Sequence, residues 1–106
     1  MKYARTTTVT IPVEKIAEFT RIYEQTILPA LKPVPGFQGA YLFNDPSTGE
    51  GFSLTFWASE KDANAYEASG LYNELVEKVR PFFTTQPTLK TYQVMAEAPS
   101  PVTASR

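Results

Sequence analysis

The sequence contains no cysteine and no histidine. Without cysteine the chain has no disulfide, no iron–sulfur cluster, no thiolate zinc site and no cysteine nucleophile. Without histidine it lacks the usual general base, the proximal ligand of haem and the commonest metal ligand. The reactive side chains that remain are tyrosine, tryptophan, asparagine, arginine and the carboxylates, and we predict no metal site.

Excess charge and long apolar runs are also missing. The net charge is −1, with acidic and basic residues interspersed, which gives no basic surface for nucleic acid or an anionic membrane. No segment approaches the roughly 20 apolar residues that cross a bilayer, and residues 1–8 lack the apolar run of a signal peptide. We therefore expect a soluble, cytoplasmic protein with neither a nucleic-acid nor a membrane partner.

The length of 106 residues suits one domain with a single core. We expect this domain to span residues 1–96. Residues 97–106 are rich in proline, alanine and serine and have no apolar pattern, so we expect a flexible C-terminal tail.

A β-hairpin is the clearest local pattern. Residues 37–44 and 51–58 both alternate in side-chain character, and residues 45–50 contain the turn formers Asp45-Pro46 and Thr48-Gly49. Alternation predicts that Phe37, Gly39, Tyr41 and Phe43 share one face. In the second strand, alternation predicts that Phe52, Leu54 and Phe56 lie on one face. It places Ser53, Thr55 and Trp57 on the other. Neither face of the hairpin is fully polar, so both need cover.

The rest of the chain predicts two more strands and two helical segments, the second of which is broken into two helices at Gly70. Proline stops or bends a helix, glycine breaks one, and serine is a good N-cap. The predicted elements are a strand over residues 3–11, a helix from Val13 that ends or kinks near Pro29, a helix capped by Ser59 and broken at Gly70, a helix from Leu71 to Pro81, and a strand over residues 88–96.

This order of elements predicts an α+β fold. Strand, helix, strand, strand, helix, strand is the split βαβ order of a ferredoxin-like domain, a four-stranded antiparallel sheet with its helices on one face. The opposite sheet face would then be open, although the hairpin places aromatic side chains there. A second copy of the chain is the simplest cover, and we predict a homodimer whose sheets face each other.

Several stretches together resemble a known family. The residues are Pro35-Gly36-Phe37, the run from Leu54 to Ala63, and Tyr92 in the closing strand. They resemble the antibiotic biosynthesis monooxygenase (ABM) domain of the dimeric α+β barrel superfamily, over nearly the whole chain except the tail. The resemblance implies oxygenation of a small aromatic substrate such as a quinol, phenol or anthrone, without a cofactor. It implies that an apolar pocket holds the substrate anion while O₂ takes an electron.

The candidate site residues lie near the predicted space between sheet and helices. Tyr66 and Tyr72 flank the Gly70 break, and Arg80 follows the apolar stripe of its helix. We assign catalytic roles to Trp57, Tyr72 and Arg80, and substrate binding to Tyr23, Tyr66 and Phe83. Each also has a purely structural interpretation, as a core aromatic or a solvated arginine.

Two other functions stay open. One is a non-catalytic dimeric module that binds a small hydrophobic ligand or only assembles. The other is a lyase or cyclase, which needs a carboxylate in the pocket that periodicity does not place there. For an oxygenase no base is evident, so deprotonation would depend on a tyrosine, a carboxylate or the acidity of the substrate.

Overall fold

The computed structural model describes residues 2–98, so residues 99–106 of the expected tail lie outside the described part. The strands are β1 (Tyr3–Thr10), β2 (Phe37–Asn44), β3 (Glu50–Trp57) and β4 (Thr88–Gln93). The helical segments are η1 (Val13–Lys15), α1 (Ile16–Ile22), η2 (Tyr23–Ile27), α2 (Leu28–Leu31), α3 (Glu60–Ala68), α4 (Leu71–Val79) and η3 (Arg80–Phe82). The last strand ends three residues earlier than the predicted 88–96, at Gln93. Among the described residues no helix is long and apolar enough to cross a membrane.

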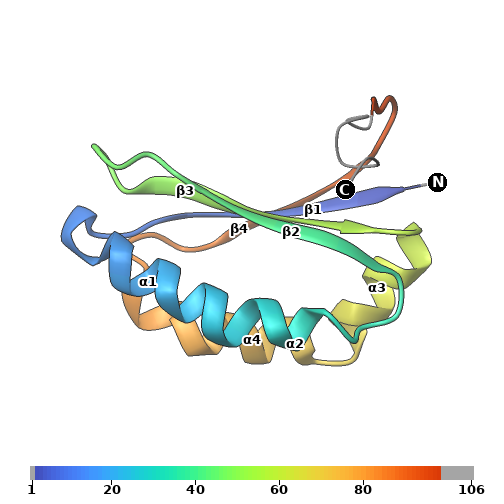
Figure 1. Ribbon diagram of the computed structural model, residues 1–106, viewed down its shortest axis with the longest axis horizontal. Helices are drawn as coiled ribbons and strands as arrows, with labels where there is room; N and C mark the ends of the chain where they lie inside the picture. The colour runs from blue at the N-terminus through green and yellow to red at the C-terminus, as the bar shows by residue number, and fades with distance from the viewer. Residues whose placement is uncertain (1, 99–106) are drawn as a thin grey trace, which may run out of the picture.

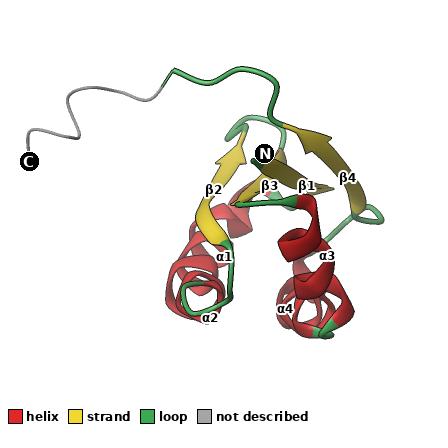
Figure 2. Cartoon of the chain, turned by 90° about the vertical axis from the view of Figure 1, so that its right-hand side faces the viewer, coloured by secondary structure: helices red, strands yellow, loops and turns green. Residues whose placement is uncertain are grey.

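The four strands form one antiparallel sheet in the order β2-β3-β1-β4. All the helices lie on one side of this sheet, as Figure 1 shows edge-on. In the view along the helices they form two columns, α1 with α2 under β2, and α3 with α4 toward β4 (Figure 2). The predicted ferredoxin-like α+β fold is confirmed.

A β-bulge near the start of β2 corrects one expectation from the sequence. The register pairs Phe37 with Trp57 but Gly39 with Phe56, so one extra residue of β2 lies between them. Gly39 has a φ of 150°, which glycine adopts without strain. Phe37 therefore lies on the helix side, with its ring 5.7 Å from that of Trp57, and not beside Tyr41 as strict alternation predicted.

The first helix continues past Pro29 and ends at Leu31. A proline in a helix interior donates no hydrogen bond and crowds the preceding turn. Here the turn before it, Tyr23–Ile27, is a wider π-helical turn. Such turns are frequent at functional sites, and this one carries Tyr23 and Ile27, which are both buried and both face the sheet.

The second helical column begins and breaks where the sequence predicts. The Ser59 hydroxyl accepts a hydrogen bond of 3.1 Å from the Asp62 backbone N–H, so Ser59 caps α3. Gly70 has a φ of 88°, and this left-handed residue separates α3 from α4. The break brings Tyr66 at the end of one helix close to Tyr72 at the start of the next, with ring centroids 6.0 Å apart.

The sheet face away from the helices carries aromatic side chains. Tyr41 is 55% exposed and Tyr92 is 52% exposed. The Phe43 and Phe52 rings stack across the strands, with centroids 4.8 Å apart. We define the aromatic outer face as Tyr41, Phe43, Phe52, Leu54, Phe56 and Tyr92. The Lys2 ammonium lies 5.7 Å from the Phe56 ring centre, and four of the six residues are 37–55% exposed in the described chain.

Candidate functional site

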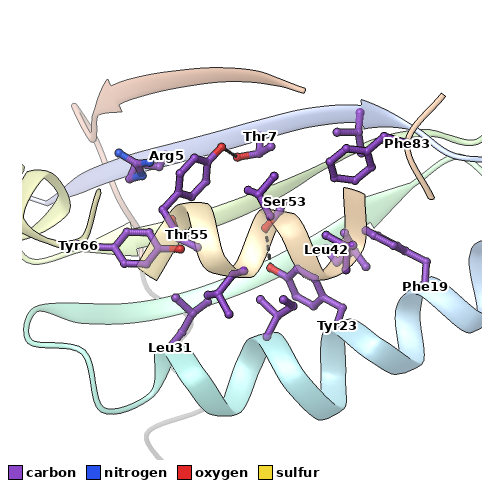
Figure 3. A pocket seen from close by; sticks show the side chains of 16 residues that line it. Arg5, Thr7, Phe19, Tyr23, Leu31, Leu42, Ser53, Thr55, Tyr66 and Phe83 are labelled. Atoms are coloured by element: carbon purple, nitrogen blue, oxygen red, sulfur yellow. Dashed lines mark hydrogen bonds between the residues drawn. The ribbon is translucent and has the colours of Figure 1, made fainter. Parts of the chain in front are cut away.

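A cavity of about 70 Å³ lies between the sheet and the two helical columns. Most of its wall is apolar, from residues such as Leu31, Leu42 and Val79. Phe19 and Phe83 close one end, and Arg5 and Tyr66 lie at the other (Figure 3). No histidine or carboxylate is among the described residues that line this cavity.

The two central strands supply a polar floor. Arg5 pairs with Thr55 across β1 and β3, and Thr7 pairs with Ser53 two residues further on. All four side chains line the cavity, because alternate residues of a strand share one face. The sheet therefore presents three hydroxyl groups and one guanidinium where a core would normally be apolar.

Three tyrosines meet this floor from the helices. The Tyr23 hydroxyl lies 2.6 Å from the Ser53 hydroxyl, and the Tyr72 hydroxyl lies 2.9 Å from that of Thr7. The Tyr66 hydroxyl has no hydrogen-bond partner within residues 2–98, and Figure 3 shows it directed into the cavity. Tyr66 is thus the phenol whose O–H remains available to a ligand.

Burial keeps two of these phenols protonated. It raises the pKa of Tyr66 well above its usual value, and the positive charge of Arg5 offsets this only partly. Burial also raises the pKa of Tyr23, against the smaller effect of the hydrogen bond to Ser53. Near neutral pH both side chains are hydrogen-bond donors, and neither is a base.

Arg5 is the charged group of the site, and it is only 3% exposed. Its Nη1 donates to Glu67 Oε1 at 2.8 Å, and its guanidinium carbon lies 4.7 Å from the Tyr72 ring centre and 5.4 Å from that of Tyr66. Its Nη2 is buried and has no hydrogen-bond partner in the described chain. A buried, unpaired donor on a charged group is costly, so this nitrogen is the strongest unsatisfied feature of the cavity.

Trp57 packs against two of the residues that line the cavity, Thr55 and Tyr66. It is fully buried, and its Nε1 donates to the Thr55 hydroxyl at 2.9 Å. Its ring stacks on that of Tyr66, with centroids 4.7 Å apart and planes at 23°. Trp57 does not line the cavity itself, so its direct effect is to fix the positions of Thr55 and Tyr66.

The structure brings together four of the six predicted site residues and separates two. Those on the cavity wall are Tyr23, Tyr66, Tyr72 and Phe83. Trp57 lies behind the wall, and Arg80 is away from it. The Arg80 side chain is about half exposed, and its Nε donates to Glu77 at 2.6 Å. Arg80 begins the 3₁₀ turn η3, where the helical spacing that suggested its position no longer applies.

Sequence reasoning missed Arg5, Thr7, Ser53 and Thr55. The information was available in the strand pattern, because Arg5 and Thr7 have the same parity as the apolar residues Tyr3 and Val9. An arginine on the parity of the core residues is unusual, since arginine is rarely buried without a partner.

Together, these features define a class of protein: a ferredoxin-like α+β domain whose cavity offers neutral phenol donors and one buried cation. The family model described as antibiotic biosynthesis monooxygenase matches residues 3–78. The chain therefore belongs to the antibiotic biosynthesis monooxygenase family. No curated protein sequence matches it.

Solved structures with the same fold have different ligands. A monooxygenase of Streptomyces coelicolor in complex with nanaomycin D superimposes with a TM-score of 0.76 at 16% identity, over 92% of each chain. SnoaB, a cofactor-independent oxygenase of Streptomyces nogalater, gives 0.73 at 13% identity, over 93% of this chain and 98% of its own. The heme-degrader MhuD of Mycobacterium tuberculosis, with two hemes bound, gives 0.73 at 19%, over 92% of this chain and 99% of its own. At these identities the likeness concerns the fold.

Proposed function

We propose that this protein is a cofactor-independent monooxygenase acting on a small aromatic substrate with a phenol-type hydroxyl. The observation that carries the proposal is that the buried Arg5, with its unpaired Nη2, and Tyr66, with its free hydroxyl, both line the cavity, with the guanidinium carbon 5.4 Å from the Tyr66 ring centre. These two donors suit an oxygen that carries negative charge, in a cavity where the low dielectric strengthens the interaction. Family membership and the oxygenases with the same fold support this interpretation.

The proposed reaction needs only O₂ as oxidant. The phenolate transfers one electron to O₂, and the resulting radical and superoxide combine to form a C–O bond at the ring carbon para to the hydroxyl. The peroxide takes up a proton, the O–O bond breaks, and the hydrogen on that carbon leaves as a proton. A phenol and O₂ thus become a para-quinone and water, a four-electron oxidation in which no reductant is consumed.

In this proposal the protein binds, holds charge and excludes water. Arg5 and Tyr66 hold the anionic oxygen, and the Tyr66 hydroxyl stays protonated because burial raises its pKa. Trp57 and Thr55 act as positioning residues, because one stacks on Tyr66 and the other accepts from Trp57. We propose roles in contacting the substrate for Tyr23, Tyr72 and Phe83, all of which line the cavity.

Haem, which the structure of MhuD contains, does not fit this site. The chain has no histidine and no cysteine to ligate iron. The remaining option in the cavity is a tyrosinate, but burial raises the pKa of both Tyr23 and Tyr66. We therefore derive no step through haem.

A homodimer is part of the proposal. The aromatic outer face, whose residues Tyr41, Phe43, Phe52 and Tyr92 are 37–55% exposed, is an apolar surface of the kind that mediates association. A second copy of the chain, placed sheet to sheet, would cover both faces at once.

The non-catalytic module is the second candidate, because no described base lines the cavity. A lyase or cyclase is not proposed, for the same reason. The module and the oxygenase differ in turnover, which is directly measurable.

Oxygen uptake with a panel of quinols, anthrones and phenols tests the proposed activity. We expect uptake by the wild type and a loss of about 10²-fold or more in Tyr66→Phe, because removing one donor to a developing oxyanion has an effect of this size. Tyr92→Phe is the matched control, since it removes a hydroxyl from the outer face, and its rate should stay within about twofold. Ligand binding without any uptake across the panel would favour the non-catalytic module.

A further inference from the structure

We infer that the substrate enters the cavity already ionised, as a phenolate-type anion about one ring in size, and that the protein selects this form and does not generate it. The inference rests on the proposed function, because it names the substrate class of the same site. The class is a planar compound whose hydroxyl is conjugated through the ring to an electron-withdrawing group such as a carbonyl, so that it ionises near neutral pH.

The first support is the charge balance of the cavity. Its described lining contains one cation, Arg5, and no carboxylate or histidine that takes up a proton. Arg5 Nη2 is buried without a partner, so an anionic oxygen would satisfy a donor that a neutral ligand leaves poorly paired. A charge-assisted hydrogen bond of this kind is roughly twice as strong as a neutral one.

The second support is the set of groups that face Arg5. From α3 these are Glu67, which pairs with Nη1 at 2.8 Å, and the ring of Tyr66; from α4 there is the ring of Tyr72. From the sheet, its neighbours in register are Thr55 on β3 and Thr91 on β4, and neither is charged. Glu67 is bound to Arg5 and lies partly in solvent, with 49% of its side chain exposed, so it does not serve as a base inside the cavity.

The third support is the lack of side chains that change their protonation state near neutral pH. With no histidine and no cysteine, the chain has no side chain whose ordinary pKa lies between about 4.5 and 10. A simple phenol has a pKa of about 10 and is almost wholly neutral at pH 7. The carboxylates of the chain are ionised at neutral pH and could accept a proton, but none is among the described residues that line the cavity. We therefore assign the acidity to the substrate.

The size of the cavity limits the substrate further. Its volume is about 70 Å³, whereas an apolar cavity of about 150 Å³ accepts benzene. A one-ring ligand thus needs a modest outward movement of wall residues, and a fused three-ring compound needs a much larger one. Of the aromatic classes considered, one-ring phenolates fit best.

Equilibrium binding of para-nitrophenol, which ionises near neutral pH, tests this inference independently of turnover. Affinity is measured over about pH 5 to 9 with para-nitroanisole, its neutral methyl ether, as matched ligand. We expect the affinity for para-nitrophenol to rise about ten- to hundredfold as the ligand ionises, because a charge-assisted hydrogen bond forms. The affinity for para-nitroanisole should not change with pH.

Two variants test whether Arg5 causes the preference for the ionised ligand. Arg5→Met should remove the pH dependence and leave para-nitroanisole binding within about threefold, whereas Arg21→Met, an exposed arginine on α1, should behave as wild type. Equal affinity for both ligands at every pH overturns the inference, as does a pH dependence that persists in Arg5→Met. The wild-type comparison alone decides the question if Arg5→Met does not fold.

The outcomes also separate this inference from the proposed function. Selective binding of the anion with no oxygen uptake by any panel compound supports the inference and contradicts the oxygenase. Oxygen uptake with binding that is indifferent to ligand ionisation supports the oxygenase and overturns the inference. Failure of both ligands to bind at about 1 mM overturns the inference, and the oxygen-uptake panel then decides on the oxygenase.

Discussion

The two faces of the central strands reverse the usual distribution of polar and aromatic side chains. An antiparallel sheet with one covered face normally places apolar residues inward and polar residues outward. Here the inward face of the central strands carries Arg5, Thr7, Ser53 and Thr55, and the outward face carries aromatic rings. We propose that the inner face binds the ligand and that the outer face mediates association.

The two faces of the sheet also differ in which of their groups lack a favourable contact. On the inner face, polar groups are buried and are costly unless paired, and in the described cavity lining Arg5 Nη2 and the Tyr66 hydroxyl are left without partners. On the outer face, aromatic rings stack on one another and still meet solvent in the described chain. Each face thus has unsatisfied groups: two donors on the inner face, and an apolar surface on the outer face.

The largest effect is expected from truncating an inner aromatic. Trp57→Ala should lower the free energy of unfolding by about 3–5 kcal/mol, because it empties a fully buried site. Tyr41→Ala on the outer face should lower it by about 1 kcal/mol or less per chain. Urea unfolding at two protein concentrations measures both values.

Protein concentration distinguishes the two faces in this experiment. If the outer face holds a dimer together, wild-type stability rises with protein concentration and Tyr41→Ala weakens that dependence. The loss in Trp57→Ala should be similar at both concentrations. Wild-type stability that is independent of concentration, together with a monomer in sedimentation at about 10 µM, would contradict the proposed homodimer.

The next effect separates stability from activity at Arg5. Removing one partner of an ion pair is costly when the remaining charge is buried, but the partner Glu67 is half exposed and stays solvated. Arg5→Met should therefore unfold within about 1 kcal/mol of wild type yet lose about 10²-fold in oxygen uptake. Thermal melts and uptake rates on one preparation check both.

Arg80→Met tests which of two arginines, Arg80 or Arg5, contributes to activity. The sequence indicated Arg80, whereas the structure places it outside the cavity in an exposed pair with Glu77. We expect Arg80→Met to retain activity within about twofold, because surface pairs contribute little. If instead Arg80→Met is inactive and Arg5→Met is active, the site is not the cavity described above.

The last effect is on alkaline stability. Burial raises the pKa of Tyr23 and Tyr66 in the folded state, so their contribution to stability is complete below the unfolded value of about 10 and is lost as pH rises above it. Each phenol should account for up to about 1.4 kcal/mol of loss per pH unit above pH 10. Tyr23→Phe and Tyr66→Phe should each flatten this dependence in urea titrations, and Tyr92→Phe should not.

Much of the fold could be predicted because its local patterns agree with the tertiary structure. Ser59 caps a helix, Gly70 breaks one, and the Asp45-Pro46 and Thr48-Gly49 turn sets the hairpin. The position of Phe37 could not be predicted, because a bulge adds one residue to β2 and reverses the face of everything before it.

The candidate site was predicted less completely than the fold. Tyr23, Tyr66, Tyr72 and Phe83 were placed on the cavity because they continue apolar stripes of helices. The strand parity of Arg5 indicated an inward position, but its partners come from α3 and α4, more than 60 residues away in the chain for Glu67, and only the assembled fold brings them together. Arg80 was expected beside the cavity from the helical spacing of α4, and the structure places it outside because the helix changes from α4 to η3 at this residue.

A crystal structure of the protein soaked with para-nitrophenolate tests most directly whether the inner face is the binding site. We predict the ring between the sheet and the helices, with its phenolate oxygen within about 3 Å of Arg5 Nη2 and the Tyr66 hydroxyl. A ring bound against Tyr41 and Phe52 on the outer face, with an empty cavity, would contradict the assignment of the two faces.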